Sequence, residues 1–203
     1  MLRLATLCAA LALAACSQPK PSTVNTTSDT APDRAQAPTE VSADAKLFTF
    51  ESADAGEWEI VNDGVMGGKS KGYTSVEDGV LKFTGTLVTQ GGGFTSVRID
   101  EDLDLSGREG LELRVRGGGR TYEVNVDDGT RMGWRQVSRR APFTTTGEWR
   151  TVRVAFDDLQ TSVHGRPVEV PAVDLSAVER LGIFIVDGRD GPFELEVDWI
   201  GVY

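Results

Sequence analysis

The sequence contains one histidine, two cysteines and three methionines among its 203 residues. His164 is therefore the sole imidazole, and no serine in a nucleophile-elbow pattern lies near it, so a histidine-dependent hydrolase is not indicated. The shortage of histidine and cysteine also leaves too few ligands for a zinc site. We interpret His164 as a surface-loop residue and expect the protein not to be an enzyme.

Basic residues are also scarce, with 21 lysines and arginines against 31 aspartates and glutamates, for a net charge of −10. An acidic chain without a dense basic patch is a poor candidate for nucleic-acid binding. Arg135, Arg139 and Arg140 form a small local group, which we interpret as a solvated loop.

Residues 1–15 form a leader with one basic residue, Arg3, and an apolar run too short to span a bilayer as a mature helix. The leader ends in Leu13-Ala-Ala-Cys16, which resembles the lipobox of bacterial lipoproteins. This predicts cleavage before Cys16 and its acylation, with palmitate as the expected chain type; the alternative is ordinary cleavage and a soluble product. Ser17 follows where enteric bacteria use aspartate for retention, which favours the outer membrane, facing the periplasm.

Cys8 lies within the leader, so the mature domain is expected to contain no thiol and no disulfide. Residues 16–45 are rich in Pro, Ser, Thr and Ala and lack apolar periodicity, which predicts a lipidated, flexible linker. A flexible chain of this length has an end-to-end distance of about 30 Å. Residues 46–203 are enough for one domain with a single core.

Alternation of apolar and polar residues with a period of two dominates this domain and predicts strands. The alternation is clearest in Leu111–Arg116, Tyr122–Asp127, Thr151–Phe156 and Phe193–Trp199. Shorter candidates are Leu47–Phe50, Trp58–Val61, Tyr73–Val76, Val80–Gly85, Phe94–Ile99 and Trp134–Ser138. Leu181–Val186 is apolar throughout, which predicts a strand covered on both faces.

Helical signals are rare: only Asp174–Glu179 is typical of a helical turn or two, with Asp174 as its cap. About ten short strands separated by glycine- and aspartate-rich turns predict an all-β fold. We expect a jelly-roll antiparallel β-sandwich.

Asn62–Ser70 contains three glycines in nine residues and is poorly explained by core packing. Its Gly-Gly-Lys-Ser ending suggests a phosphate-binding loop, but Asp63 stands where that motif needs glycine, and an extended segment follows instead of a helix. A second glycine cluster, Gly91–Gly93, precedes Phe94. We expect the two loops to meet at one end of the sandwich.

Several motifs follow one another along the domain: Trp58, Asn62–Gly68, Phe83–Gly85, Gly91–Phe94, Arg114–Gly117, Gly119–Tyr122, Trp149 and Asp190–Ile200. Together they resemble the Complex I intermediate-associated protein 30 domain family. The resemblance implies a galactose-binding-domain-like fold and a non-catalytic role as an assembly chaperone, since mitochondrial members assist assembly of respiratory complex I. Gly118 departs from the aspartate that members often carry there. The predicted envelope location also faces away from the site of complex I assembly.

We therefore predict a membrane-tethered binding or assembly module that acts through contacts with an unidentified protein partner or membrane complex. The candidate contact residues are Asn62, Asp63, Met66, Gly67, Gly68, Gly92, Gly93 and Phe94. Phe94 is included because Val97 and Ile99 are expected to point inward, which places Phe94 on the opposite face. The alternative is that the string Asn62–Gly68 builds an internal turn.

A second hypothesis is binding of carbohydrate or cell-wall glycan, because exposed aromatic side chains stack on sugars. Trp134 and Trp149 are its candidates, although either could belong to the core. A structural calcium ion is a further possibility near Glu51 and Asp198, because the first and last strands of jelly rolls often lie side by side. No other cofactor is expected.

Overall fold

The computed structural model describes residues 45–51 and 55–203. The predicted leader, Cys16 and the linker up to residue 44 lie outside the described residues. The strands in the first half are β1 (Lys46–Thr49), β2 (Glu59–Asn62), β3 (Lys71–Glu77), β4 (Val80–Leu87), β5 (Thr95–Leu103), β6 (Gly110–Gly117) and β7 (Thr121–Asp127). The later strands are β8 (Arg131–Met132), β9 (Arg135–Gln136), β10 (Ser138–Thr144), β11 (Arg150–Ala155), β12 (Gln160–Val163), β13 (Arg166–Pro167), β14 (Val178–Ile185) and β15 (Gly191–Val202).

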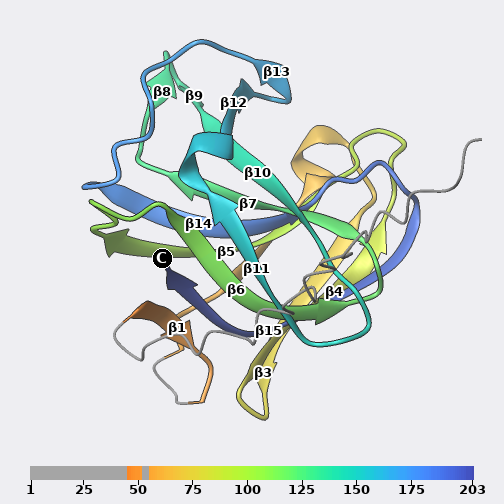
Figure 1. Ribbon diagram of the computed structural model, residues 1–203. Coiled ribbons are helices and arrows are strands. Elements are labelled where there is room, and N and C mark those ends of the chain that lie inside the picture. Colours follow the sequence, from red (N-terminus) through yellow and green to blue (C-terminus); the bar gives the residue numbers. More distant parts are fainter. Residues whose placement is uncertain (1–44, 52–54) are drawn as a thin grey trace, which may run out of the picture. The chain divides into compact units, whose positions relative to one another are not determined.

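The strands form two antiparallel sheets and a small hairpin (Figure 1). The six-stranded sheet has the order β11-β6-β15-β4-β3, with β1 also pairing with β15. The seven-stranded sheet has the order β13-β12-β10-β7-β14-β5-β2, and β8 pairs with β9 alone. The predicted all-β sandwich of jelly-roll type is thereby confirmed, as is the pairing of the first strand with the last.

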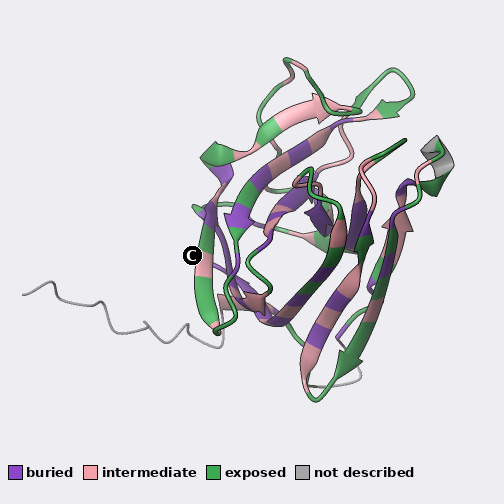
Figure 2. Cartoon of the chain, turned by 90° about the vertical axis from the view of Figure 1, so that its right-hand side faces the viewer, coloured by how far each residue is buried: buried purple, intermediate pink, exposed green. Residues whose placement is uncertain are grey.

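Alternation along the strands places apolar side chains between the sheets, and Figure 2 shows buried and less buried residues alternating along them. At the centre of the core, the Phe83 ring packs edge-on against Phe193, with centroids 4.9 Å apart. Tyr122 stacks on Phe143 at 5.9 Å and donates its hydroxyl to the Glu194 carbonyl oxygen at 2.9 Å. These rings belong to one larger core of buried aliphatic and aromatic side chains, and burial of that apolar surface is the main source of stability in a domain without disulfides.

The predicted helix at Asp174–Glu179 is wrong. The Asp174 side chain does accept hydrogen bonds from the backbone and hydroxyl groups of Ser176 at 3.0 and 2.6 Å, but the result is a single turn. Val178 already begins β14 because its side chain is needed in the core. Within the described residues, the only helices are short 3-10 segments, η2 (Asp63–Met66) and η3 (Phe156–Asp158). None is long and apolar enough to cross a membrane.

The expectation of one strand at Trp134–Ser138 is also wrong, because the chain turns there from β9 into the longer β10. Pro142 lies within β10, where its missing N–H weakens the strand signal. The pairing of β10 with β12 ends at Arg140, so β12 requires no donor from Pro142. The short strands β12 and β13 were not expected from the sequence.

The interpretation of Arg135, Arg139 and Arg140 as a solvated loop fails for the last two residues. Both lie on β10, and Arg139 is only 1% exposed. Its Nη1 contacts Asp128 Oδ1 at 2.5 Å, and this carboxylate neutralises the buried charge. His164 is exposed in the turn between β12 and β13, as expected.

Candidate functional site

The two glycine-rich loops meet around the carboxylate of Asp63, at the start of η2. Asp63 is fully buried, and its Oδ1 accepts a hydrogen bond from the Ser70 backbone N–H at 3.0 Å. Its Oδ2 accepts from the Ser70 hydroxyl and the Gly93 N–H, both at 2.7 Å. One carboxylate thus joins the Asn62–Ser70 loop to the Gly91–Phe94 loop.

The glycines around this carboxylate are required by space. A Cβ at Gly68 would lie 2.0 Å from Asp63 Cγ, and one at Gly92 would lie 2.4 Å from Oδ2. Gly67, which ends η2, has a φ of +81° that other residues adopt at a cost. The glycine content that core packing did not explain therefore comes from close approach to a buried charge.

Burial raises the pKa of Asp63, but the hydrogen bonds from Gly93, Ser70 and Phe94 outweigh it, so the pKa lies below its ordinary value. Asn62 has a similar linking role at the end of β2. Its Oδ1 accepts hydrogen bonds from the Gly72 N–H at 2.8 Å and the Thr95 hydroxyl at 2.7 Å. The side chains of Asn62 and Asp63 are therefore engaged inside the protein, which favours the internal-turn interpretation for these two residues.

The predicted contact residues are brought together, although they differ in accessibility. The backbone of Met66 belongs to η2, and its side chain lies outside what the structure describes. Phe94 is partly exposed and points to the outward side of the seven-stranded sheet, where its ring centroid lies 6.2 Å from that of Phe184. Contact of this loop cluster with a partner stays a prediction.

The outward side of the seven-stranded sheet carries a group that the sequence did not indicate as a site. We call it the arginine face and define it by Glu123, Asp127, Arg98, Arg140, Arg180 and Phe184. The guanidinium carbons of Arg98 and Arg140 lie 4.7 and 5.0 Å from the Phe184 ring centroid. Phe184 is only 7% exposed although it points outward, because these side chains cover it. The uninterrupted apolar run of β14 was the available signal, and its prediction of a strand covered on both faces is confirmed.

Carboxylates neutralise two of the three arginines on the arginine face. Arg140 Nη1 lies 2.9 Å from Glu123 Oε2. Arg180 pairs with Asp100 and also lies 3.7 Å from Asp127 Oδ2. Burial raises the pKa of Asp127, although its hydrogen bond from Gly129 and the charge of Arg180 oppose the shift.

The two tryptophans proposed for sugar stacking lie in different environments. Trp134 is 77% exposed in the β8–β9 hairpin, with the Arg135 guanidinium carbon 4.9 Å from its ring centroid. Trp149 is partly buried, and Arg116 and Arg114 lie over its ring at 4.9 and 5.8 Å. Only Trp134 presents a largely open ring.

The calcium candidates lie near the pairing of β1 with β15. Asp198 forms an ion pair with Arg114 at 3.0 Å, so it is already partly neutralised, and the Glu51 side chain is exposed beside the turn at Gly79. Across residues 45–51 and 55–203, no three His, Cys, Asp or Glu side chains gather in a metal-holding group. These residues do not fit a calcium site by themselves. The calcium site stays a prediction, tested by thermal melts with and without chelator, where an unchanged midpoint rejects it.

Residues 48–197 match the family model of the Complex I intermediate-associated protein 30. The chain is 30% identical over 177 residues to the mitochondrial protein of that name from Mus musculus, covering 75% of this chain and 54% of the relative. It is 27% identical over 133 residues to the Drosophila melanogaster protein, covering 62% and 45%. The chain thus spans about half the length of the curated relatives it matches.

Among solved structures, the chain is similar to the family 11 carbohydrate-binding module of the cellulosomal cellulase Lic26A-Cel5E from Clostridium thermocellum. The TM-score is 0.58 at 13% identity, covering 77% of this chain and 92% of that module. A family 11 module from the same organism, in complex with a β-1,3-1,4-mixed-linked tetrasaccharide, has a TM-score of 0.58 at 15% identity, with coverage of 78% and 94%. At these identities the likeness concerns the fold alone.

Proposed function

The chain belongs to the Complex I intermediate-associated protein 30 family, and we propose that it is a non-catalytic binding module that assists assembly through protein–protein contacts. The observation that carries the proposal is the family match, which confirms the resemblance inferred from the motifs and spans residues 48–197. The chemistry of the described residues agrees with this role. Buried acidic side chains are engaged by structural partners, as in Asp63 with backbone N–H groups and Asp187 with Arg120, and His164 lies in an exposed turn.

The second part of the proposal is a lipid tether at Cys16 that holds the module at the cell envelope, in the outer membrane and facing the periplasm. It rests on the lipobox and on Ser17 after it. In that position the partner would be an envelope protein or membrane complex, because respiratory complex I is assembled elsewhere. Replacement Cys16→Ser tests the tether: the full chain should move from the membrane fraction to the soluble fraction, and retention in the membrane would refute lipidation at this residue.

The protein-contact role is tested by crosslinking the full chain in its native membrane and identifying what is captured. We expect a small, reproducible set of envelope proteins, captured equally well by a control variant changed on the exposed side of β11, Arg153→Ala. Capture of wall glycan without protein would contradict the proposal. Capture of respiratory subunits would identify the partner as a complex I component.

Glycan binding is a second candidate, and the exposed ring of Trp134 is the observation that favours it. Tryptophan fluorescence of the full chain, titrated with common polysaccharides, should then respond in the unchanged protein and not in Trp134→Ala. Absence of a response across those polysaccharides would remove this candidate.

A further inference from the structure

Arg98, in the middle of β5, is a partly buried cation that forms no ion pair within the described part of the chain, although Glu59 lies opposite it on β2 and the charges of Asp127 and Asp100 act on it from neighbouring positions. Among the described residues, none of the ion pairs includes it. Its Nε donates a hydrogen bond to the Ser96 hydroxyl at 2.8 Å, and its guanidinium lies over the Phe184 ring. The two terminal nitrogens have no hydrogen-bond acceptor among the described residues. They remain available to a ligand.

A partly buried guanidinium without an ion pair lowers the stability of the folded protein. Burial, together with the neighbouring charges of Arg180 and Arg140, lowers the pKa of Arg98 to about 10, although the charges of Asp127 and Asp100 oppose the shift. At neutral pH the group is still protonated, so a charge is held partly out of water with only a hydroxyl and an aromatic ring to replace hydration. Arg140 and Arg180 differ because each has a carboxylate partner.

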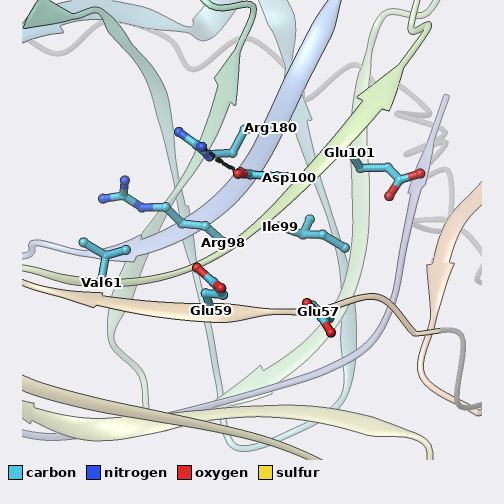
Figure 3. A pocket seen from close by; sticks show the side chains of 8 residues that line it. All are labelled: Glu57, Glu59, Val61, Arg98, Ile99, Asp100, Glu101 and Arg180. Atoms are coloured by element: carbon cyan, nitrogen blue, oxygen red, sulfur yellow. Dashed lines mark hydrogen bonds and ion pairs between the residues drawn. The ribbon is translucent and has the colours of Figure 1, made fainter.

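A cavity of about 490 Å³ opens beside Arg98 on the same face. Its lining includes Arg98 and Arg180 together with Glu57, Glu59 and Glu101. Figure 3 shows the Arg98 head group extending toward Val61, in the opposite direction from Glu57 and Glu101. The cavity therefore has the Arg98 guanidinium at one end and the carboxylates of Glu57 and Glu101 at the other, with Glu59, the neighbour of Arg98 on β2, between them.

We propose that Arg98 binds a carboxylate side chain of a partner polypeptide on the arginine face. A guanidinium presents two parallel N–H donors that match the planar geometry of a carboxylate. A dianionic phosphate fits less well, because Glu57, Glu59 and Glu101 border the same cavity and would repel it. Those glutamates can accept hydrogen bonds from backbone N–H groups or pair with a lysine, so the complementary ligand is a segment that carries an acidic residue and a neighbouring basic one.

The location agrees with the loop cluster described above. Val61 directly precedes Asn62, and Phe94 directly follows Gly93, whose N–H donates to Asp63. Val61 and Phe94 therefore connect the arginine face to the two loops that Asp63 joins. The partly exposed Phe94 ring next to Phe184 adds an apolar contact beside the charged one. The site thus deepens the proposed assembly role, on which it rests, by naming the chemistry of the partner segment.

In the test, the purified full chain is titrated with a capped peptide in which Lys comes directly after Glu. Binding is monitored by NMR through the amide signals of Ser96 and Gly182. We expect saturable shifts, a dissociation constant at least about tenfold weaker for the matched Gln-Lys peptide, and a similar loss in Arg98→Met. Arg98→Lys keeps the charge without the paired donors, so intermediate affinity is expected. Arg153→Met, changed on the opposite sheet, should bind normally.

Equal binding of the two peptides, or unchanged binding by folded Arg98→Met, would overturn the proposal. Tighter binding of inorganic phosphate or of a galacturonic acid oligosaccharide than of the Glu-Lys peptide would also overturn it, because the source of the anion would not be a polypeptide. Failure of the assembly role gives a different result from failure of this proposal. In that case crosslinking would capture no protein, while peptide binding would still depend on Arg98. A folded variant is confirmed from the dispersion of its amide signals.

Discussion

The outward sides of the two sheets carry charges in different ways. On the six-stranded sheet, four cations are matched with carboxylates on neighbouring strands, and we call this the paired face. Its ion pairs are Lys82–Glu77 at 2.7 Å, Arg114–Asp198 at 3.0 Å, Arg153–Glu112 at 2.8 Å, and Arg116–Glu196. On the arginine face, Arg98 has no such partner, and an aromatic ring is hidden under guanidinium groups.

The difference between the two faces indicates which of them is suited to bind a partner. Cross-strand pairs on an exposed face satisfy each other and contribute little to stability, typically less than about 1 kcal/mol each. A partly buried cation without a partner lowers stability instead, and its presence calls for a role that folding does not supply. The paired face is thus a solvated surface, while the arginine face has, in Arg98, hydrogen-bond donors that are free to bind a partner.

The largest expected effect is the loss of stability when a buried ion pair is broken, compared with the loss for an exposed pair. Arg139→Met removes the partner of the buried Asp128 carboxylate and should lower the free energy of unfolding by about 3–5 kcal/mol. The matched change Arg116→Met on the paired face should lower it by no more than about 1 kcal/mol. Urea unfolding measures both, and similar losses would show that burial does not distinguish these pairs.

The next effect concerns the loops that border the arginine face. Asp63→Ala leaves the backbone N–H groups of Gly93 and Ser70 without their acceptor and leaves the Ser70 hydroxyl only the Val88 carbonyl oxygen, so we expect a loss of about 3 kcal/mol. Lys69→Ala, an exposed change in the same loop, should stay within about 0.5 kcal/mol. A near-neutral Asp63→Ala, measured by thermal and urea unfolding, would remove the structural interpretation of this residue.

The same carboxylate predicts a pH dependence. Because the pKa of Asp63 is lower in the folded protein than its ordinary value of 3.8, its ionised form stabilises the fold above that value. This stabilisation should be lost as the pH falls through the lower, folded pKa. The stability difference between the unchanged protein and Asp63→Ala should therefore be full at pH 7 and smaller at pH 3. A constant difference would contradict the charge-assisted hydrogen bonds.

The smallest effect is the most direct comparison of the two faces. Arg98→Met should leave the free energy of unfolding unchanged or raise it by up to about 1 kcal/mol, because no ion pair is lost and a partly buried charge is removed. Arg153→Met, which loses its pairing with Glu112, should lower it slightly, by about 0.5 kcal/mol. A clear loss in Arg98→Met would mean that this guanidinium is there for packing on Phe184.

The alternation of residues was sufficient to predict most of the fold. The segment Leu111–Arg116 indicates which side chains point inward, because the orientation of a residue in a regular strand depends on its parity. The same rule holds in β15 as far as Val197, but a bulge between Val197 and Trp199 shifts the parity, so that Ile200 joins the core cluster and Trp199 does not. The motifs also identified the family. The same approach failed at β10, where Pro142 and two arginines interrupt the pattern, and at Asp174, whose capping chemistry serves a turn as well as a helix.

The sequence by itself thus determined the sandwich, its inward residues and its family, because these depend on local periodicity and on motif strings. Only the tertiary structure decided which charges have partners: Arg180 on β14 pairs with Asp100 on β5, and Arg98, also on β5, forms no ion pair with any described residue. Pairing depends on strands that are distant in the sequence and adjacent in the sheet. The same reason explains why the glycines of Asn62–Ser70 could be noticed in the sequence, while the buried carboxylate that requires them became visible only when the second loop was folded against it.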